Sequence, residues 1–177
     1  YWHQLFNPRQ LLTNGLFLEK ANEISKNEDQ RVLSLLAING LVNRNSKLMI
    51  WDSGYDKSIQ TFANQALNTL YNFPVRAMSS IYSCWKFELK NKDFSCNSQV
   101  QLKDARTIDT KCDIWITDPP YADAVNYHEL SEFFLAWDKG LIDIFPDWYT
   151  DSKRILAVRG SGETFNSSMV DIYSNLA

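Results

Sequence analysis

Residues 112–121, with the sequence CDIWITDPPY, constrain the fold more than any other part of the chain. The first six of these residues alternate apolar and β-branched side chains, a pattern that is typical of a buried strand. Pro119 and Pro120 have no amide hydrogen to donate to a sheet, so the strand must end there. Pro119 also biases Asp118 toward an extended backbone. The sequence therefore predicts a strand that ends in a stiff turn, which carries a carboxylate and the ring of Tyr121.

The rest of the chain predicts an α/β fold, in which a short parallel sheet is flanked by several helices. Helices are expected at 8–26, 28–42, 59–70, 82–89, 126–140 and 165–176. Strands are expected at 48–51, 100–102 and 112–117, and residues 155–158 are expected to form either a strand or a buried connection. In an open α/β sheet, functional residues lie outside the carboxyl ends of the strands. We therefore expect the turn after residue 117 to lie at an active-site edge.

Capping signals define the ends of several expected helices. Asn7 followed by a proline predicts the start of the first helix, and Ser58 is placed to cap the third. Asn126 and Glu129 have the spacing of a capping box, and Gly140 is placed to end the helix that they begin.

Composition limits the classes of protein that the chain can represent. Its 177 residues are 45% hydrophobic and 22% charged, which suits one domain with a real core. The aromatic fraction of 14% is high, and we expect these rings mainly in the core, with a base-stacking surface as the alternative. A net charge of -3 argues against a strongly basic module that wraps DNA.

The cysteines and the apolar runs bear on the compartment. Cys84, Cys96 and Cys112 fit no zinc-binding spacing, so we expect no metal site. No apolar run reaches the length that spans a bilayer, so no membrane association is expected. A cytoplasmic location is the simplest expectation for such a chain.

The tetrapeptide DPPY after an apolar strand resembles the catalytic motif of S-adenosylmethionine-dependent amino-methyltransferases. The longer stretch DPPYADAVNYHELSEFFLAW is similar to the corresponding region of large prokaryotic adenine-specific DNA methylases. The segments LFNPRQLL, WDSG…TFANQAL and AVRGSGETF also resemble that group, so the likeness covers most of the chain. It implies a partial Rossmann-like methyltransferase domain, with residues 1–177 forming one domain of a larger protein.

The same resemblance implies a reaction. The chain would transfer a methyl group from S-adenosylmethionine to the 6-amino group of adenine in double-stranded DNA, with the target base flipped out of the helix. That amine is a poor nucleophile, and acceptors aimed at its two hydrogens can offset the charge that develops on nitrogen. Asp118 would be one acceptor, and a carbonyl that Pro119 and Pro120 position would be the other. Tyr121 would stack on the base.

Weaker signals surround the motif. By resemblance, Asp104 and Ala105 would lie near the adenine of the cofactor, although an ordinary surface aspartate is an equal reading. Asn126 and Tyr127 are candidates to line the base pocket, with a plain helix cap as the alternative role for Asn126. His128 is expected at the rim of the site.

The glycine-rich stretch that begins at Gly160 is expected to be a loop that starts the last helix, because it lacks the aromatic and acidic residues usual in a cofactor loop. No segment before Asp118 matches such a loop. We therefore expect these residues alone to have weak or no activity, with further domains of the larger protein needed. Two alternatives stay open: a non-catalytic scaffold or nucleic-acid-binding module, and an amino-methyltransferase that acts on RNA or protein.

Overall fold

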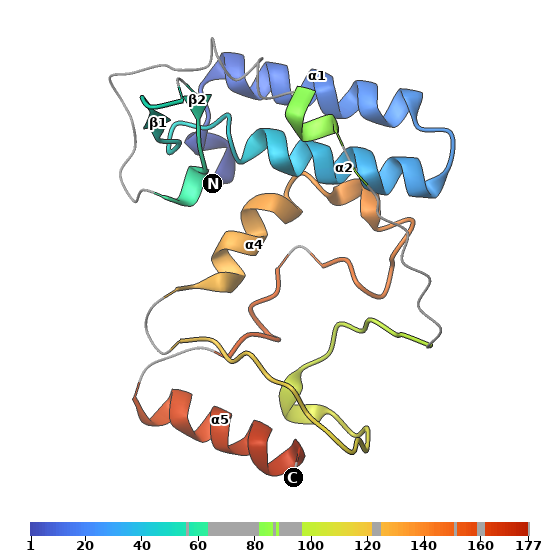
Figure 1. The fold of residues 1–177 in the computed structure, drawn as a ribbon, viewed down its shortest axis with the longest axis vertical. Helices are drawn as coiled ribbons and strands as arrows, with labels where there is room; N and C mark the ends of the chain where they lie inside the picture. The colour runs from blue at the N-terminus through green and yellow to red at the C-terminus, as the bar shows by residue number, and fades with distance from the viewer. Residues whose placement is uncertain are drawn as a thin grey trace.

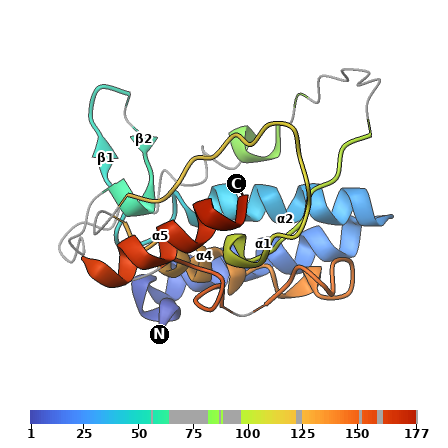
Figure 2. The ribbon, with the colours of Figure 1, turned by 90° about the horizontal axis from the view of Figure 1, so that it is seen from below.

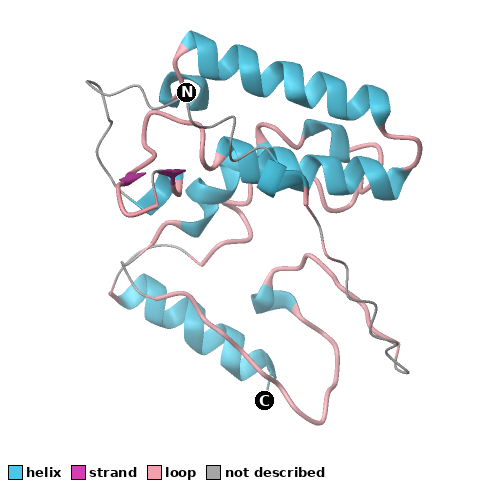
Figure 3. Ribbon diagram, turned by 45° about the horizontal axis from the view of Figure 1, so that its top comes forward, coloured by secondary structure: helices cyan, strands magenta, loops and turns pink. Residues whose placement is uncertain are grey.

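The computed structural model describes residues 1–55, 57–63, 82–86, 88, 97–121, 125–150, 152–158 and 162–176. Within these ranges the protein is mostly helical (Figure 3). The described strands are β1 (Trp51–Asp52) and β2 (Lys57–Ser58), which pair in an antiparallel sheet. A Rossmann-like domain requires parallel strands joined by crossover connections. The predicted parallel sheet, and with it the partial Rossmann-like class, is therefore wrong.

The segments expected to form parallel strands have no sheet partner among the described residues. Residues 100–102 and 112–117 run as irregular chain, and residues 154–156 form a turn. Ile114 and Ile116 are 77% and 94% exposed, so the apolar alternation is not buried. An alternating pattern needs a neighbouring strand to take its backbone hydrogen bonds and to cover one face. The strand expected at 48–51 begins only at Trp51.

Two long helices lie side by side and form one layer (Figure 1): α1 (Pro8–Ile24) and α2 (Glu28–Val42). The first begins as predicted, because Asn7 Oδ1 accepts a hydrogen bond from the Gln10 amide at 2.9 Å and Gln10 Oε1 accepts one from the Asn7 amide. Asn27 caps α2 in a similar way through the Gln30 amide. The predictions of both helices are confirmed.

The other described elements are shorter, apart from the last helix. They are η1 (Trp2–Leu5), η2 (Thr61–Ala63), η3 (Ala105–Thr107), α4 (Tyr127–Leu135), η4 (Lys139–Leu141) and α5 (Glu163–Leu176). The last helix is confirmed, and Gly162 precedes it with a φ of 58°. The rest of the glycine-rich loop, residues 160–161, lies outside the described residues.

Several expected helix ends are wrong. The Asn126 side chain makes no cap hydrogen bond, so the capping box with Glu129 does not form. The helix α4 ends at Leu135, and Gly140 lies in η4. Ser58 pairs in β2 and caps no helix. Residues 64–70 of the expected third helix lie outside the described residues; residues 82–85 of the fourth are helical.

An aromatic cluster joins α4 to the helix layer. The ring of Phe133 is fully buried and stacks on Phe6, with centroids 5.5 Å apart. Phe62 and Phe134 each pack edge-to-face with Phe133, with ring centroids 5.0 Å apart. Because Ile38 of α2 belongs to the same cluster, the C-terminal half of α4 is fixed to the layer. Its N-terminal half extends toward α5, which lies at the opposite end of the molecule (Figure 1).

The chain between residues 104 and 121 returns past α5, as the view from below shows (Figure 2). Contacts between α5 and η3 fix this arrangement. In the parts of the chain that the structure describes, no helix combines the length and apolar character needed to cross a bilayer.

Candidate functional site

A cavity of about 830 Å³ separates α5 from the motif segment. Its walls come from residues 115–121, from residues 125–128 at the start of α4, from residues 156–158, and from Ala105 and Ile108. Residues of α5 line it as well. This volume lies within the range of about 300–1,000 Å³ that is usual for small-molecule sites.

All four residues of the predicted catalytic motif, Asp118, Pro119, Pro120 and Tyr121, line this cavity. The Asp118 side chain is exposed, and it forms no ion pair or hydrogen bond with any described residue. The carbonyl of Pro119 likewise accepts no hydrogen bond within the described ranges. Both groups are thus available to a ligand, and the ring of Tyr121, which is 70% exposed, lies beside them.

The start of α4 brings the two predicted pocket residues to the same cavity. Asn126 and Tyr127 both line it, and so does His128, which was expected at the rim. Because the Asn126 side chain is not used as a helix cap, its amide remains able to meet a ligand. The structure therefore brings together residues 118–121 and 126–128.

Of the two predicted cofactor residues, only one reaches the cavity. Ala105 lines the cavity, whereas Asp104 does not. Asp104 Oδ2 accepts a hydrogen bond from Arg106 Nη2 at 2.6 Å, and Asp104 Oδ1 accepts bonds from the Arg106 amide and Nε at 2.9 Å. Hydrogen bonding from Arg106 lowers the pKa of the Asp104 carboxyl below its usual value. The carboxylate is therefore already committed to a neighbouring arginine.

The face of α5 was missed as part of the site. The cavity is lined by its residues Phe165, Met169, Ile172, Tyr173 and Leu176. Their helical spacing indicates an apolar face, which on sequence alone suits packing in a core. Tyr173 Oη lies 3.5 Å from Thr117 Oγ1 and links this helix to the residue before Asp118. The spacing of these residues predicts an apolar face on α5 but does not show which segment lies against it. No sequence signal therefore assigned α5 to the site.

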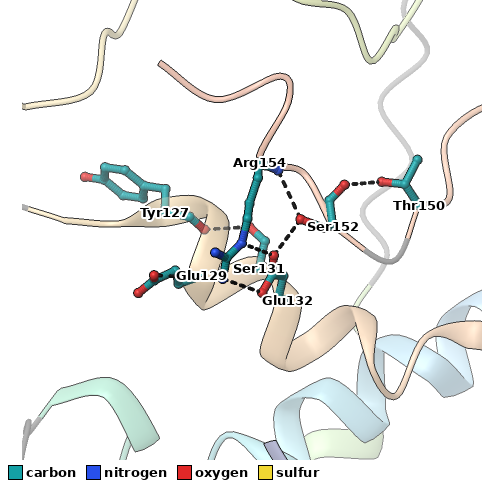
Figure 4. Close-up of polar contacts among 7 residues, drawn as sticks. All are labelled: Tyr127, Glu129, Ser131, Glu132, Thr150, Ser152 and Arg154. Carbon is teal, nitrogen blue, oxygen red and sulfur yellow. Dashed lines mark hydrogen bonds and ion pairs between the residues drawn. The ribbon is translucent and has the colours of Figure 1, made fainter. Parts of the chain in front are cut away.

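An ion pair fixes another wall of the cavity to α4 (Figure 4). Arg154 Nε donates to Glu132 Oε1 at 2.7 Å, and Arg154 Nη2 donates to Glu132 Oε2 at 3.1 Å. Ser152 Oγ donates to the same carboxylate at 2.5 Å. The hydrogen bonds from Arg154, and to a smaller extent the one from Ser152, lower the pKa of Glu132 to about 2. The sequence pattern gave no sign of this pairing across 22 residues.

The arrangement suits a planar, largely apolar ligand that carries an amino group. Aromatic side chains, among them Trp115, Tyr121 and Phe165, supply ring surfaces. Asp118 supplies an acceptor, and Asn126 supplies both a donor and an acceptor. Comparison with protein families, curated proteins and solved structures finds no match to this chain.

Proposed function

We propose that this protein transfers a methyl group from S-adenosylmethionine to the 6-amino group of adenine in DNA, with the target base flipped into the cavity. The observation that carries the proposal is the position of the motif. Residues 118–121 line a cavity together with Asn126 and Tyr127, and the carboxylate of Asp118 has no partner among the described residues. The proposal rests on these side chains and requires no parallel sheet.

The base would be held by its amino hydrogens. The nitrogen lone pair of adenine is delocalised into the ring, and two acceptors on its hydrogens favour a more tetrahedral nitrogen. Asp118 offers a charged acceptor. The carbonyl of Pro119, which accepts no hydrogen bond from a described residue, offers a neutral acceptor whose direction is set by the proline rings. Acceptors that are fixed before the reaction stabilise developing positive charge without reorganisation.

The aromatic surface of the cavity supports an extruded base. Tyr121, Trp115 and Phe165 all line the cavity, so a flipped ring has faces on which to stack. Stacking on an aromatic side chain contributes about 1–3 kcal/mol per base. This energy offsets part of the unstacking that flipping requires.

The methyl donor is the second component of the proposed reaction. S-adenosylmethionine supplies a methyl group on a positively charged sulfur when it is bound. Of the two residues expected to hold it, Asp104 does not fit, because Arg106 occupies its oxygens. Ala105 borders the cavity but offers no side-chain polar group. We therefore assign no residue to the donor.

The commitment of Asp104 to Arg106 favours one alternative, a non-catalytic module that binds unpaired bases in nucleic acid. Titration calorimetry with S-adenosylmethionine separates the two functions. Heat of binding supports methyl transfer, and no heat with the full-length protein supports the binding module.

The direct test is transfer of a labelled methyl group to DNA, with N6-methyladenine identified by mass spectrometry. We expect Asp118→Ala to lower the rate about 10²–10³-fold, as loss of one transition-state hydrogen-bonding group does elsewhere. The matched control is Asp113→Ala, which removes an exposed carboxylate that does not line the cavity. Equal rates for Asp118→Ala and Asp113→Ala would contradict the proposed role of Asp118. Label on RNA or protein, and none on DNA, would replace the proposed substrate.

A further inference from the structure

Residues 152–158 form a wall of the cavity that is held by polar contacts. Leu156, Ala157 and Val158 line the cavity. Residues 154–156 form a turn that includes Leu156, and the amides of Leu156 and Ala157 donate to the carbonyl of Lys153 at 3.1 Å. The Ile155 side chain is 84% exposed and Leu156 is only half-buried, so no residue of this turn belongs to the buried core. Its position therefore depends on contacts with neighbouring elements.

Arg154 attaches the wall to α4 (Figure 4). Its guanidinium makes two hydrogen bonds to Glu132, and it also lies 3.9 Å from Glu129 Oε1. Ser152 closes the same cluster, because its Oγ donates to Glu132 and accepts a bond from the Arg154 amide at 3.2 Å. A two-pronged pair of this kind fixes direction as well as distance.

Arg106 holds the other side of the wall. Its Nη2 donates to the carbonyl of Ile155 at 3.1 Å, while Asp104 holds the same guanidinium from η3. Two arginines thus hold the wall: its own Arg154, which pairs with Glu132 of α4, and Arg106 of η3, which donates to the Ile155 carbonyl. Both of these elements also contribute residues to the cavity.

The α4 contact links the wall to the residues that would hold the base. The helix that carries Glu132 begins with Tyr127 and His128, which line the cavity one to two turns earlier. A shift of Arg154 would therefore change the distance between residues 156–158 and the start of α4. Exposed ion pairs contribute little to overall stability, but small displacements of a positioning group can reduce the rate strongly.

We propose that Arg154 is a positioning residue, which sets the width of the base cavity by binding Glu132. The inference rests on the proposed function, because adenosine is its probe. Arg154 does not itself contact the base in this account. It acts through the backbone that continues into Leu156 and Val158.

The test compares Arg154→Gln and Glu132→Gln with Arg31→Gln in the full chain. The control removes an arginine from another ion pair, in which Arg31 of α2 lies 3.5 Å from Asp143 in the turn after η4, and neither partner lines the cavity. We expect both site variants to bind adenosine about tenfold more weakly, because the cavity is no longer preorganised for the base. The control should bind adenosine as the unmodified protein does.

Three further readouts separate positioning from general support of the fold. Amide hydrogen exchange at residues 152–158 should accelerate in Arg154→Gln, whereas exchange in α1 and α2 should not change. The double variant Glu132→Arg with Arg154→Glu, in which the two charged residues trade places, should recover most of the adenosine affinity. Arg154→Lys should recover only part of it, because an ammonium group cannot make the two-pronged contact.

The outcomes distinguish this inference from the proposed function. If Asp118→Ala weakens adenosine binding and Arg154→Gln does not, the inference is overturned and the proposed function stands. If exchange in Arg154→Gln accelerates throughout the chain, with α1 and α2 included, the role is structural and the inference is also overturned. If the unmodified protein does not bind adenosine, the proposed function fails and the inference fails with it.

Discussion

Asp138 follows the end of α4 and carries a buried carboxyl group, with 6% of the residue's surface exposed. Its Oδ2 accepts a hydrogen bond from Asn39 Nδ2 of α2 at 2.9 Å. The Oδ1 atoms of both residues lack a partner among the described residues. Burial raises the pKa of Asp138 to about 6, and the Asn39 bond offsets only part of that effect. The residue joins two helices, but its charged form is poorly compensated there.

This arrangement makes folding depend on pH. Between its ordinary pKa of 3.8 and its folded value of about 6, Asp138 binds more protons in the folded state than in the unfolded state. The free energy of unfolding should therefore decrease as pH rises through this window, and then stay level with respect to this group.

Asp138→Asn should remove this dependence. An amide can donate to Asn39 Oδ1 and still accept from Asn39 Nδ2, so both unpaired atoms gain partners. We expect a gain of about 1–3 kcal/mol at pH 7 and little difference at pH 4. Urea unfolding at both pH values measures it. A loss of stability at pH 7 would mean that a cation pairs with the carboxylate.

Glu132 should act in the opposite direction at lower pH. Its folded pKa of about 2 lies below its ordinary value of 4.5, so its contribution is present above pH 4.5 and is lost as pH falls toward 2. Glu132→Gln should therefore flatten the decrease in stability between pH 4.5 and 2. Acid titration of the melting temperature tests this, and an unchanged slope would count against the ion pair with Arg154.

At the scale of elements, α4 is held by the ring of Phe133, which packs between Phe6 and Phe62. Removing that ring leaves a cavity in the aromatic cluster. We expect Phe133→Ala to lower the free energy of unfolding by about 3–5 kcal/mol. The control Tyr127→Ala, at the exposed end of the same helix, should change it by less than about 1 kcal/mol. Similar losses for the two variants would show that α4 is not anchored through Phe133.

The helices that were predicted correctly depend on signals within the helix itself. Asn7 with Pro8 and Gln10 defines a start by local hydrogen bonds, and the spacing of Met169 and Ile172 defines a face. The expected strands failed because a strand depends on a partner that its own sequence does not contain. Ile114 and Ile116 alternate correctly and still lie exposed.

At the scale of the whole molecule, the aromatic cluster and the cavity lie at different ends of α4 (Figure 1). Residues 118–121 and 126–128 could be predicted as one site because they are close in sequence. The faces of α5 and of residues 156–158 could not, because their approach to the motif depends on tertiary packing. The pairing of Glu132 with Arg154 is of the same kind.

Because the cavity and the helix layer are separate, a ligand in the cavity should change amide hydrogen exchange near the cavity and not in the layer. Adenosine should slow amide hydrogen exchange at residues 115–121 and 156–158, which line the cavity. It should have little effect on α1 and α2, which contribute no lining residue. Hydrogen exchange read by mass spectrometry tests this, and protection confined to the helix layer would place the ligand elsewhere.

In the proposed function, Asp118 and the Pro119 carbonyl accept hydrogen bonds from the two amino hydrogens of adenine. Calorimetry with adenosine, N6-methyladenosine and N6,N6-dimethyladenosine tests it most directly, because this series removes the hydrogens one at a time. A hydrogen bond to a charged group contributes about 1.5–3 kcal/mol, so we expect affinity to fall by about tenfold or more when the hydrogen on Asp118 is lost. Asp118→Ala should remove most of this difference, and Asp113→Ala should retain it. Equal affinity for all three nucleosides in the unmodified protein would contradict the account.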